Sequence, residues 1–141
     1  MTIFATHAPY YWEAGLPVIP LKTHDCGEKG AGKAPILNDW TRYGSQGVTQ
    51  VEKDAWIRSY PNQNIGLPFG ASSGLCAIDI DTEDEKLIEA IREILPPTPW
   101  VRVGKKGMGL IYKWSGQRNF KLAGEDGMIC EFLGAGNQMV M

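Results

Sequence analysis

The chain has 141 residues, of which 43% are hydrophobic and 21% charged, and its formal net charge is −2 at pH 7. This size and composition suit a single globular domain that buries a core without disulfides or metal, and the slight negative charge excludes a uniformly basic nucleic-acid-binding coat. No apolar run reaches membrane-spanning length and no secretory leader pattern is visible, so we expect a cytoplasmic protein with no membrane partner.

The first half of the chain carries the signals of two helices and two strands. Thr49 and Glu52 have the spacing of a capping box, so a helix is expected to start there and to run through Ser59. The aromatic segment before Gly15 is also predicted to be helical. In chain order we expect a helix, a strand, a long loop, a helix and a strand over residues 4–14, 16–21, 22–48, 50–59 and 64–68.

The glycine-rich segment GEKGAGKAP, residues 27–35, resembles the start of a phosphate-binding loop. Its glycines and Lys33 fit the opening of G-x-x-x-x-G-K-[ST]. Ala34, however, stands where that loop needs a hydroxyl group on the magnesium ion, and Pro35 removes a backbone donor where the helix should begin. We therefore expect no triphosphatase activity at Lys33.

The segment LCAIDID, residues 75–81, alternates between two faces, as a half-buried strand does. Asp79 and Asp81 therefore share one face. Two ionised carboxylates side by side repel each other, and a divalent cation is the partner that would hold both. The D-x-D pattern alone leaves a second interpretation open, in which Asp81 helps to cap the next helix and Asp79 is solvated.

The second half of the chain predicts one helix and a series of hairpins. Thr82 and Glu85 form another capping-box pattern. Five apolar residues at helical spacing are expected to pack that helix against the sheet: Leu87, Ile88, Ile91, Ile94 and Leu95. Further strands are predicted over residues 99–103, 109–114, 128–133 and 137–141. The fold class is therefore mixed α and β.

Acidic and basic residues are segregated along the chain. Seven acidic residues lie between Asp79 and Glu93, whereas residues 94–124 contain none. The basic residues of that second window are Arg102, Lys105, Lys106, Lys113, Arg118 and Lys121. An acidic strand end facing this basic segment would hold a metal ion and a polyphosphate together, and two separate solvated faces would give the same pattern.

Two further features bear on this choice. Residues 104–109 (GKKGMG) offer backbone amides and the ammonium groups of Lys105 and Lys106, which suits a triphosphate, although a plain glycine hairpin is the alternative. Glu131 is the single acid in the apolar run ICEFL, where burial is unfavourable without a partner. Together with the two aspartates it resembles a two-metal phosphoryl-transfer site.

Several motifs must be explained together: YYWEAGLPVIPL, the K-x-P of Lys33 to Pro35, Trp40, Trp56 and NIGLPFGASSGLCAIDID. Their combination resembles the bifunctional DNA primase/polymerase (prim-pol) family of the archaeo-eukaryotic primase superfamily, over almost the whole chain. The most specific part is N-I-G, a glycine-bearing turn and an apolar strand that ends in D-x-D. By this resemblance Lys33 belongs to the family's K-x-P loop.

The resemblance implies an α+β fold, with an α/β N-terminal unit packed on a partial RRM-like β-rich unit and the active site in the cleft between them. Asp79 and Asp81 match the family's first motif and Glu131 the acid of its third motif, so these three would bind Mg²⁺ or Mn²⁺ and serve as the catalytic residues. The implied nucleotide-binding residues are Lys105, Lys106, Arg102 and Lys33.

The implied reaction is template-directed nucleotide addition in phage, plasmid or prophage replication. Its partners would be nucleoside triphosphates, a single-stranded DNA template and a helicase that is fused or separate. We expect residues 1–141 to form one such domain, truncated at its C-terminus from a longer replication protein. Relatives continue beyond the third motif with a Pro-Pro-Ser-x-His segment, which is absent here.

The second motif departs from the family, because the histidine that it usually carries is replaced by Leu110 or a neighbour in the stretch GMGLIY. A non-catalytic replication module of the same fold, which binds nucleic acid or a replication partner, is therefore the alternative. The retained acids oppose it. An RNA-binding protein built on an RRM-like sheet ranks last, because the sequence shows no recognisable aromatic pair in adjacent predicted strands.

Overall fold

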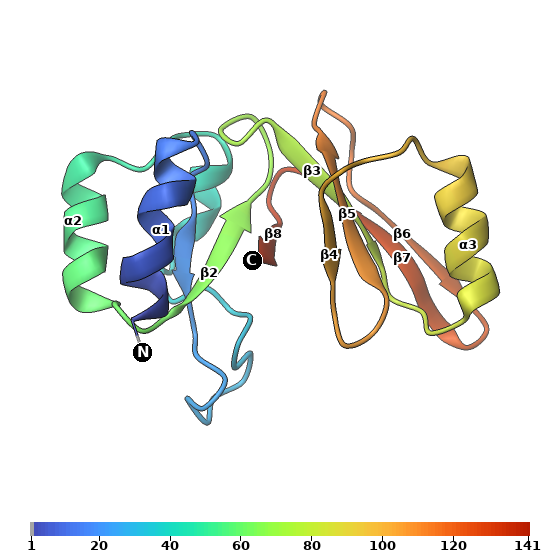
Figure 1. Ribbon diagram of the computed structural model, residues 1–141, viewed down its shortest axis with the longest axis horizontal. Coiled ribbons are helices and arrows are strands. Elements are labelled where there is room, and N and C mark those ends of the chain that lie inside the picture. Colours follow the sequence, from blue (N-terminus) through green and yellow to red (C-terminus); the bar gives the residue numbers. More distant parts are fainter. Residues whose placement is uncertain (1) are drawn as a thin grey trace.

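Two antiparallel sheets organise the chain, and the computed structural model describes residues 2–141 (Figure 1). The three-stranded sheet has the order β1-β2-β8 and the five-stranded sheet the order β4-β5-β3-β7-β6. The helices are α1 (Ile3–Glu13), α2 (Gln50–Ser59), α3 (Glu85–Ile94) and the short 3-10 helix η1 (Trp40–Gly44). The strands are β1 (Ile19–Leu21), β2 (Asn64–Pro68), β3 (Leu75–Ile80), β4 (Val101–Val103), β5 (Met108–Lys113), β6 (Phe120–Gly124), β7 (Gly127–Leu133) and β8 (Gln138–Val140). The α+β class is confirmed.

The helices α1 and α2 pack against the three-stranded sheet, and their buried residues share its apolar core. Phe4 is fully buried and packs edge to face on Trp12, and Trp56 from α2 packs in the same way on Tyr43 of η1. The capping box expected at the start of α2 is present, with Thr49 accepting a hydrogen bond from the Glu52 amide. Phe4, Tyr43 and Trp56 are therefore core residues, and Trp12 packs against them.

The helix α3 covers the face of the five-stranded sheet that points away from the first sheet (Figure 1). The predicted alternation of β3 is confirmed, because Cys76, Ile78 and Ile80 belong to the apolar cluster under α3 while Ala77 belongs to the core of the first sheet. Within residues 2–141, no helix has both the length and the apolarity needed to cross a membrane.

Three details of the second half differ from the sequence prediction. The N-cap of α3 is Asp84, whose carboxylate accepts from the amides of Lys86 and Leu87, whereas Thr82 accepts only from the amide of Asp84. The Asp is the stronger acceptor and sits one residue before the first helical turn. Ile94 is 83% exposed, so only part of the apolar helix face packs on the sheet. The strand β6 was not predicted, since all of its residues are exposed.

The strand β8 joins the two sheets. It follows β7 in the chain, yet it pairs with β2 in the other sheet. Met139 of β8 is 6% exposed and lies in one apolar cluster with Ala77 of β3 and Ile111 of β5. One continuous core therefore extends from the first sheet to the inner face of the second.

Candidate active site

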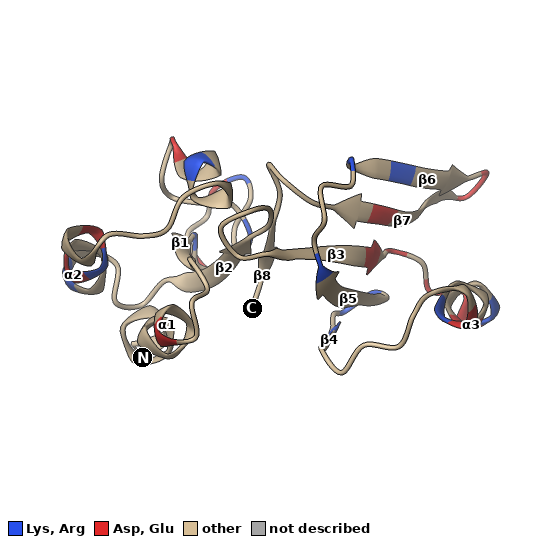
Figure 2. Ribbon diagram, turned by 90° about the horizontal axis from the view of Figure 1, so that it is seen from above, with Lys and Arg blue, Asp and Glu red and all other residues tan. Residues whose placement is uncertain are grey.

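A row of charged side chains crosses the five-stranded sheet. The register pairs Arg102 with Gly109, Gly109 with Asp79, Asp79 with Glu131, and Glu131 with Lys121. Residues directly opposite each other in antiparallel strands point to the same face. We call these five residues the charged row. Figure 2 shows its acidic segments on β3 and β7 beside a basic segment on β6.

The charged row faces the first sheet. Ala77 lies on the same side of β3 as Asp79 and packs into the core shared with the first sheet, whereas α3 covers the other side. Asp81 follows just after β3, where its backbone amide still bonds to the Ile129 carbonyl of β7 at 2.8 Å. The register thus places Glu131 beside Asp79, with Asp81 two residues further along the same chain segment.

The electrostatics of the row are strained at Asp79. The pKa of this carboxyl is raised above its ordinary value, chiefly because partial burial disfavours the charged form. The negative charges of Asp81 and Glu131 raise it further, whereas Arg102 and Lys33 lower it. Burial and the two neighbouring acids therefore outweigh the two cations at the Asp79 carboxyl.

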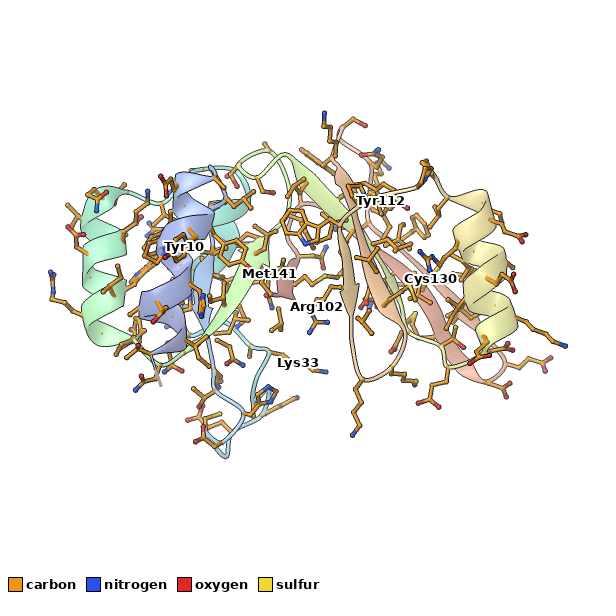
Figure 3. The ribbon with its side chains drawn as sticks, viewed as in Figure 1. Tyr10, Lys33, Arg102, Tyr112, Cys130 and Met141 are labelled. Atoms are coloured by element: carbon orange, nitrogen blue, oxygen red, sulfur yellow. The ribbon has the colours of Figure 1, made fainter. Side chains whose placement is uncertain are left out.

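Lys33 and Arg102 come from different parts of the fold, a loop after β1 of the first sheet and the strand β4 of the second. Lys33 lies on the loop after β1, and Figure 3 shows both side chains in the space between the two sheets. Lys33 is exposed and Arg102 is half-buried on β4. Two cations that come from distant parts of the sequence thus act on the carboxyl group of Asp79.

Lys121 is a neighbour that the sequence did not assign to the site. Its ammonium group lies 3.3 Å from Oε1 of Glu131, and the Lys121 side chain is 72% exposed. An ion pair this exposed is weak, so it leaves the Glu131 carboxylate accessible to a stronger ligand. The pairing depends on the register of β6, and the alternation of the sequence carries no signal for that register.

Lys105 and Lys106 occupy the hairpin between β4 and β5, where Gly107 adopts a φ of 66°. A Cβ atom at Gly107 would collide with the carbonyl oxygen of Ile80, so this turn requires glycine. Both lysines are exposed, and neither is among the charges that shift the pKa of Asp79. The structure therefore does not bring them to the carboxylates as it does Lys33 and Arg102.

Gly109 is the buried gap of the charged row, between Arg102 and Asp79. A Cβ atom there would stand 2.7 Å from Cε of Met139, which reaches in from β8. Gly109 lies in the stretch GMGLIY, in which a histidine was expected. The space beside Asp79 that a side chain at this position would take is filled by a methionine from the other sheet.

The carboxylates have the chemistry of ligands for Mg²⁺ or Mn²⁺, which prefer oxygen donors. Within residues 2–141, however, no group of three or more His, Cys, Asp or Glu side chains is arranged to hold a metal ion. Asp79 and Glu131 thus form a facing pair rather than a complete protein cage.

Comparison with protein families gives one match that covers most of the chain. The profile described as bifunctional DNA primase/polymerase, N-terminal, matches residues 8–141. Comparison with curated proteins gives no match.

Proposed function

Because the chain belongs to the bifunctional DNA primase/polymerase N-terminal family, we propose that it is a metal-dependent nucleotidyltransferase domain that extends a strand on a single-stranded DNA template. Family membership itself indicates a primase/polymerase-type role in DNA replication. The finer statements concern the metal, the nucleotide and the template, and they rest on the charged row.

One observation carries the proposal: Asp79 and Glu131 face each other in adjacent strands while Lys33 and Arg102 act on the same carboxylate. Mg²⁺ in polymerase sites is commonly held by one or two protein carboxylates together with substrate phosphates, so a facing pair is a sufficient protein contribution. Asp79 and Glu131, with Asp81 beside them, are therefore the proposed ligands of Mg²⁺ or Mn²⁺. When bound, the metal would favour ionisation of the attacking 3′ hydroxyl and stabilise the leaving pyrophosphate.

The cations of the site have a separate task. Lys33 and Arg102 bind and orient the triphosphate against the carboxylates, since ammonium and guanidinium groups form strong charge-assisted bonds with phosphate oxygens. Lys105 and Lys106 lie in the turn of the short hairpin between β4 and β5. There they contact the outer phosphates or the nucleic-acid backbone as substrates enter. Neutralising the phosphates also reduces their repulsion by the charged row.

The fold supports a further assignment. We propose that the five-stranded sheet is the partial RRM-like unit, that the substrates bind in a cleft between the two sheets, and that the domain works within a larger replication protein of a phage, plasmid or prophage. A helicase, fused or separate, would supply the single-stranded template.

The test is calorimetry of a deoxynucleoside triphosphate with Mn²⁺. Asp79→Asn should weaken binding about tenfold or more, because it removes the charge on a proposed metal ligand. Asp54→Asn, the same substitution on α2 and far from the charged row, should leave the affinity unchanged. A wild-type protein that binds no nucleotide in the presence of Mn²⁺ would contradict the proposal.

A non-catalytic nucleic-acid-binding module is the second candidate, and Gly109 in the second-motif stretch favours it. In that case Lys106→Ala should weaken DNA binding and flatten its salt dependence. Asp79→Asn should leave DNA binding unchanged or strengthen it, because it removes a repulsive charge. Asp79→Asn therefore distinguishes the two candidates. It weakens nucleotide binding if the domain is a nucleotidyltransferase, and it leaves DNA binding unchanged or stronger if the domain only binds nucleic acid.

A further inference from the structure

The loop that carries Lys33 is held through three successive carbonyl groups. The carbonyl oxygen of Gly32 accepts from Nδ2 of Asn64 at 3.2 Å, and that of Lys33 accepts from Nε2 of Gln138 at 2.9 Å. The carbonyl oxygen of Ala34 accepts from the backbone amide of Lys22 at 2.8 Å. All three donors belong to, or directly follow, strands of the first sheet. The loop is therefore fixed to the sheet by its backbone.

The two side-chain donors come from neighbouring strands, Asn64 from β2 and Gln138 from β8. Gly66 leaves the space that Gln138 needs, because a Cβ atom at Gly66 would stand 2.6 Å from Oε1 of Gln138 and 2.6 Å from Cδ2 of Leu21. The residues of N-I-G thus have a local role: Asn64 donates to the loop, and Gly66 admits the second donor.

The side chain of Gln138 that donates this hydrogen bond also contributes unfavourably to stability. Its Oε1 atom is buried and has no hydrogen-bond partner. A buried acceptor without a partner destabilises a protein, and a methionine at this position would fill the same space without that effect. The presence of Gln138 at this position is explained if the hydrogen bond from its Nε2 to the Lys33 carbonyl has a function.

We propose that Asn64 and Gln138 form an amide clamp that positions Lys33 for the nucleotide triphosphate. This inference rests on the proposed function, in which Lys33 contacts the phosphates. Planar peptide units leave two torsions for each residue, so holding the carbonyls of Gly32 and Lys33 fixes the backbone of Lys33 and the direction of its Cα–Cβ bond. A lysine whose backbone is already in place loses less entropy when its side chain binds phosphate. Asn64 and Gln138 are positioning residues, since they act through Lys33.

The experiment compares Gln138→Met with Gln50→Met in the presence of Mn²⁺ and a deoxynucleoside triphosphate. Both substitutions remove one amide donor, but Gln50 donates to Asp54 on α2, remote from the loop. Gln138→Met should weaken nucleotide binding about threefold to tenfold, the effect of one lost hydrogen bond, and Gln50→Met should not.

A double-mutant cycle with Lys33→Ala distinguishes positioning from general stability. In the Lys33→Ala background, Gln138→Met should cause no further loss of affinity, because the group that it positions is gone. Gly66→Ala is a second route to the same result, since its Cβ would displace Oε1 of Gln138 as well as the buried Leu21 side chain. It should weaken binding in the wild-type background alone.

The outcomes separate this inference from the proposed function. If the wild-type protein binds no nucleotide, the proposed function fails. If it binds, and Lys33→Ala weakens binding while Gln138→Met does not, the clamp is refuted and the function stands. Equal losses from Gln138→Met with and without Lys33 would also refute the clamp, since they would reflect a change in stability, which thermal unfolding of the same variants measures.

Discussion

Gly109 lies in the stretch GMGLIY, where the histidine of the second motif is missing, and Met139 packs against it. The backbone of Gly109 lies beside Asp79, and the thioether of Met139 occupies the space over it. Methionine adapts easily to small changes in its surroundings, so the contact tolerates a methyl group better than a ring. Whether a histidine can be accommodated at position 109 therefore depends on β8.

We predict that Gly109→His destabilises the protein by about 1–3 kcal/mol, because the ring must displace the buried Met139 side chain. Gly109→Ala is the matched control and should have a smaller effect, since only the flexible end of Met139 has to move. Urea unfolding of Gly109→His with and without Met139→Ala measures the coupling. Equal losses of stability in both backgrounds would mean that Met139 does not fill the space.

At this scale the sequence predicted the faces of residues and grouped Glu131 with Asp79 and Asp81, but it did not predict the partner of Glu131 on β6. Period-two alternation is sufficient to place Asp79 on the other face of β3 from Cys76 and Ile78, because side chains in a strand point to alternate faces. The pairing of Glu131 with Lys121 depends on strand register, which changes at an irregularity between Leu122 and Ala123. No local pattern encodes that register, so part of the charged row appeared only in the fold.

Among the elements, α2 was predicted most accurately because its start is encoded locally. Glu52 accepts from the Thr49 amide at 2.9 Å, from the Tyr43 hydroxyl at 2.9 Å and from Arg42 at 2.9 Å. Burial raises the pKa of Glu52, but these hydrogen bonds and the charge of Arg42 outweigh it, so the pKa is lowered overall. The helix cap also ties α2 to η1.

We predict that Glu52→Gln lowers the free energy of unfolding at pH 7 by about 1 kcal/mol, which corresponds to about 3 °C in Tm. A carboxyl whose pKa is lowered on folding stabilises the protein above its unfolded pKa, and this contribution is lost as the pH falls through the folded value. The difference between wild type and variant should therefore shrink as the pH falls below the unfolded pKa of a glutamate, about 4.3, and through the lower folded value. Glu85→Gln, in the first turn of α3, is the control, and an unchanged difference at low pH would contradict the prediction.

The helix α3 and the strand β6 show where local patterns fail. Thr82 has the capping-box spacing, but Asp84 is closer to the first turn and caps α3 with two hydrogen bonds. Ile94 fits the apolar periodicity and is nevertheless exposed, because it lies at the last helical position, at the edge of the packed area. The residues of β6 lie on an exposed edge, where no burial forces alternation.

For the whole molecule, the shared core predicts a single cooperative unfolding transition. Ala77 and Ile111 of the second sheet pack in one cluster with Met139 and the first sheet, so unfolding of either sheet exposes buried apolar residues of the other. Tryptophan fluorescence and far-ultraviolet circular dichroism should give coincident midpoints. Met139→Ala should lower the free energy of unfolding by about 2–5 kcal/mol without splitting the transition. Two separate transitions in calorimetry would contradict this.

The path of β8 also sets an order of events during synthesis. Because β2 pairs with β8 on one edge, the first sheet remains incomplete until residues 138–140, which follow every strand of the second sheet in the chain, have left the ribosome. Until then β2 exposes unpaired backbone groups, and the pairing of such distant segments is slow because a long loop must close first. The nascent chain therefore passes through a stage that is prone to association with other chains, and the same late step aligns Gln138 with the loop of Lys33.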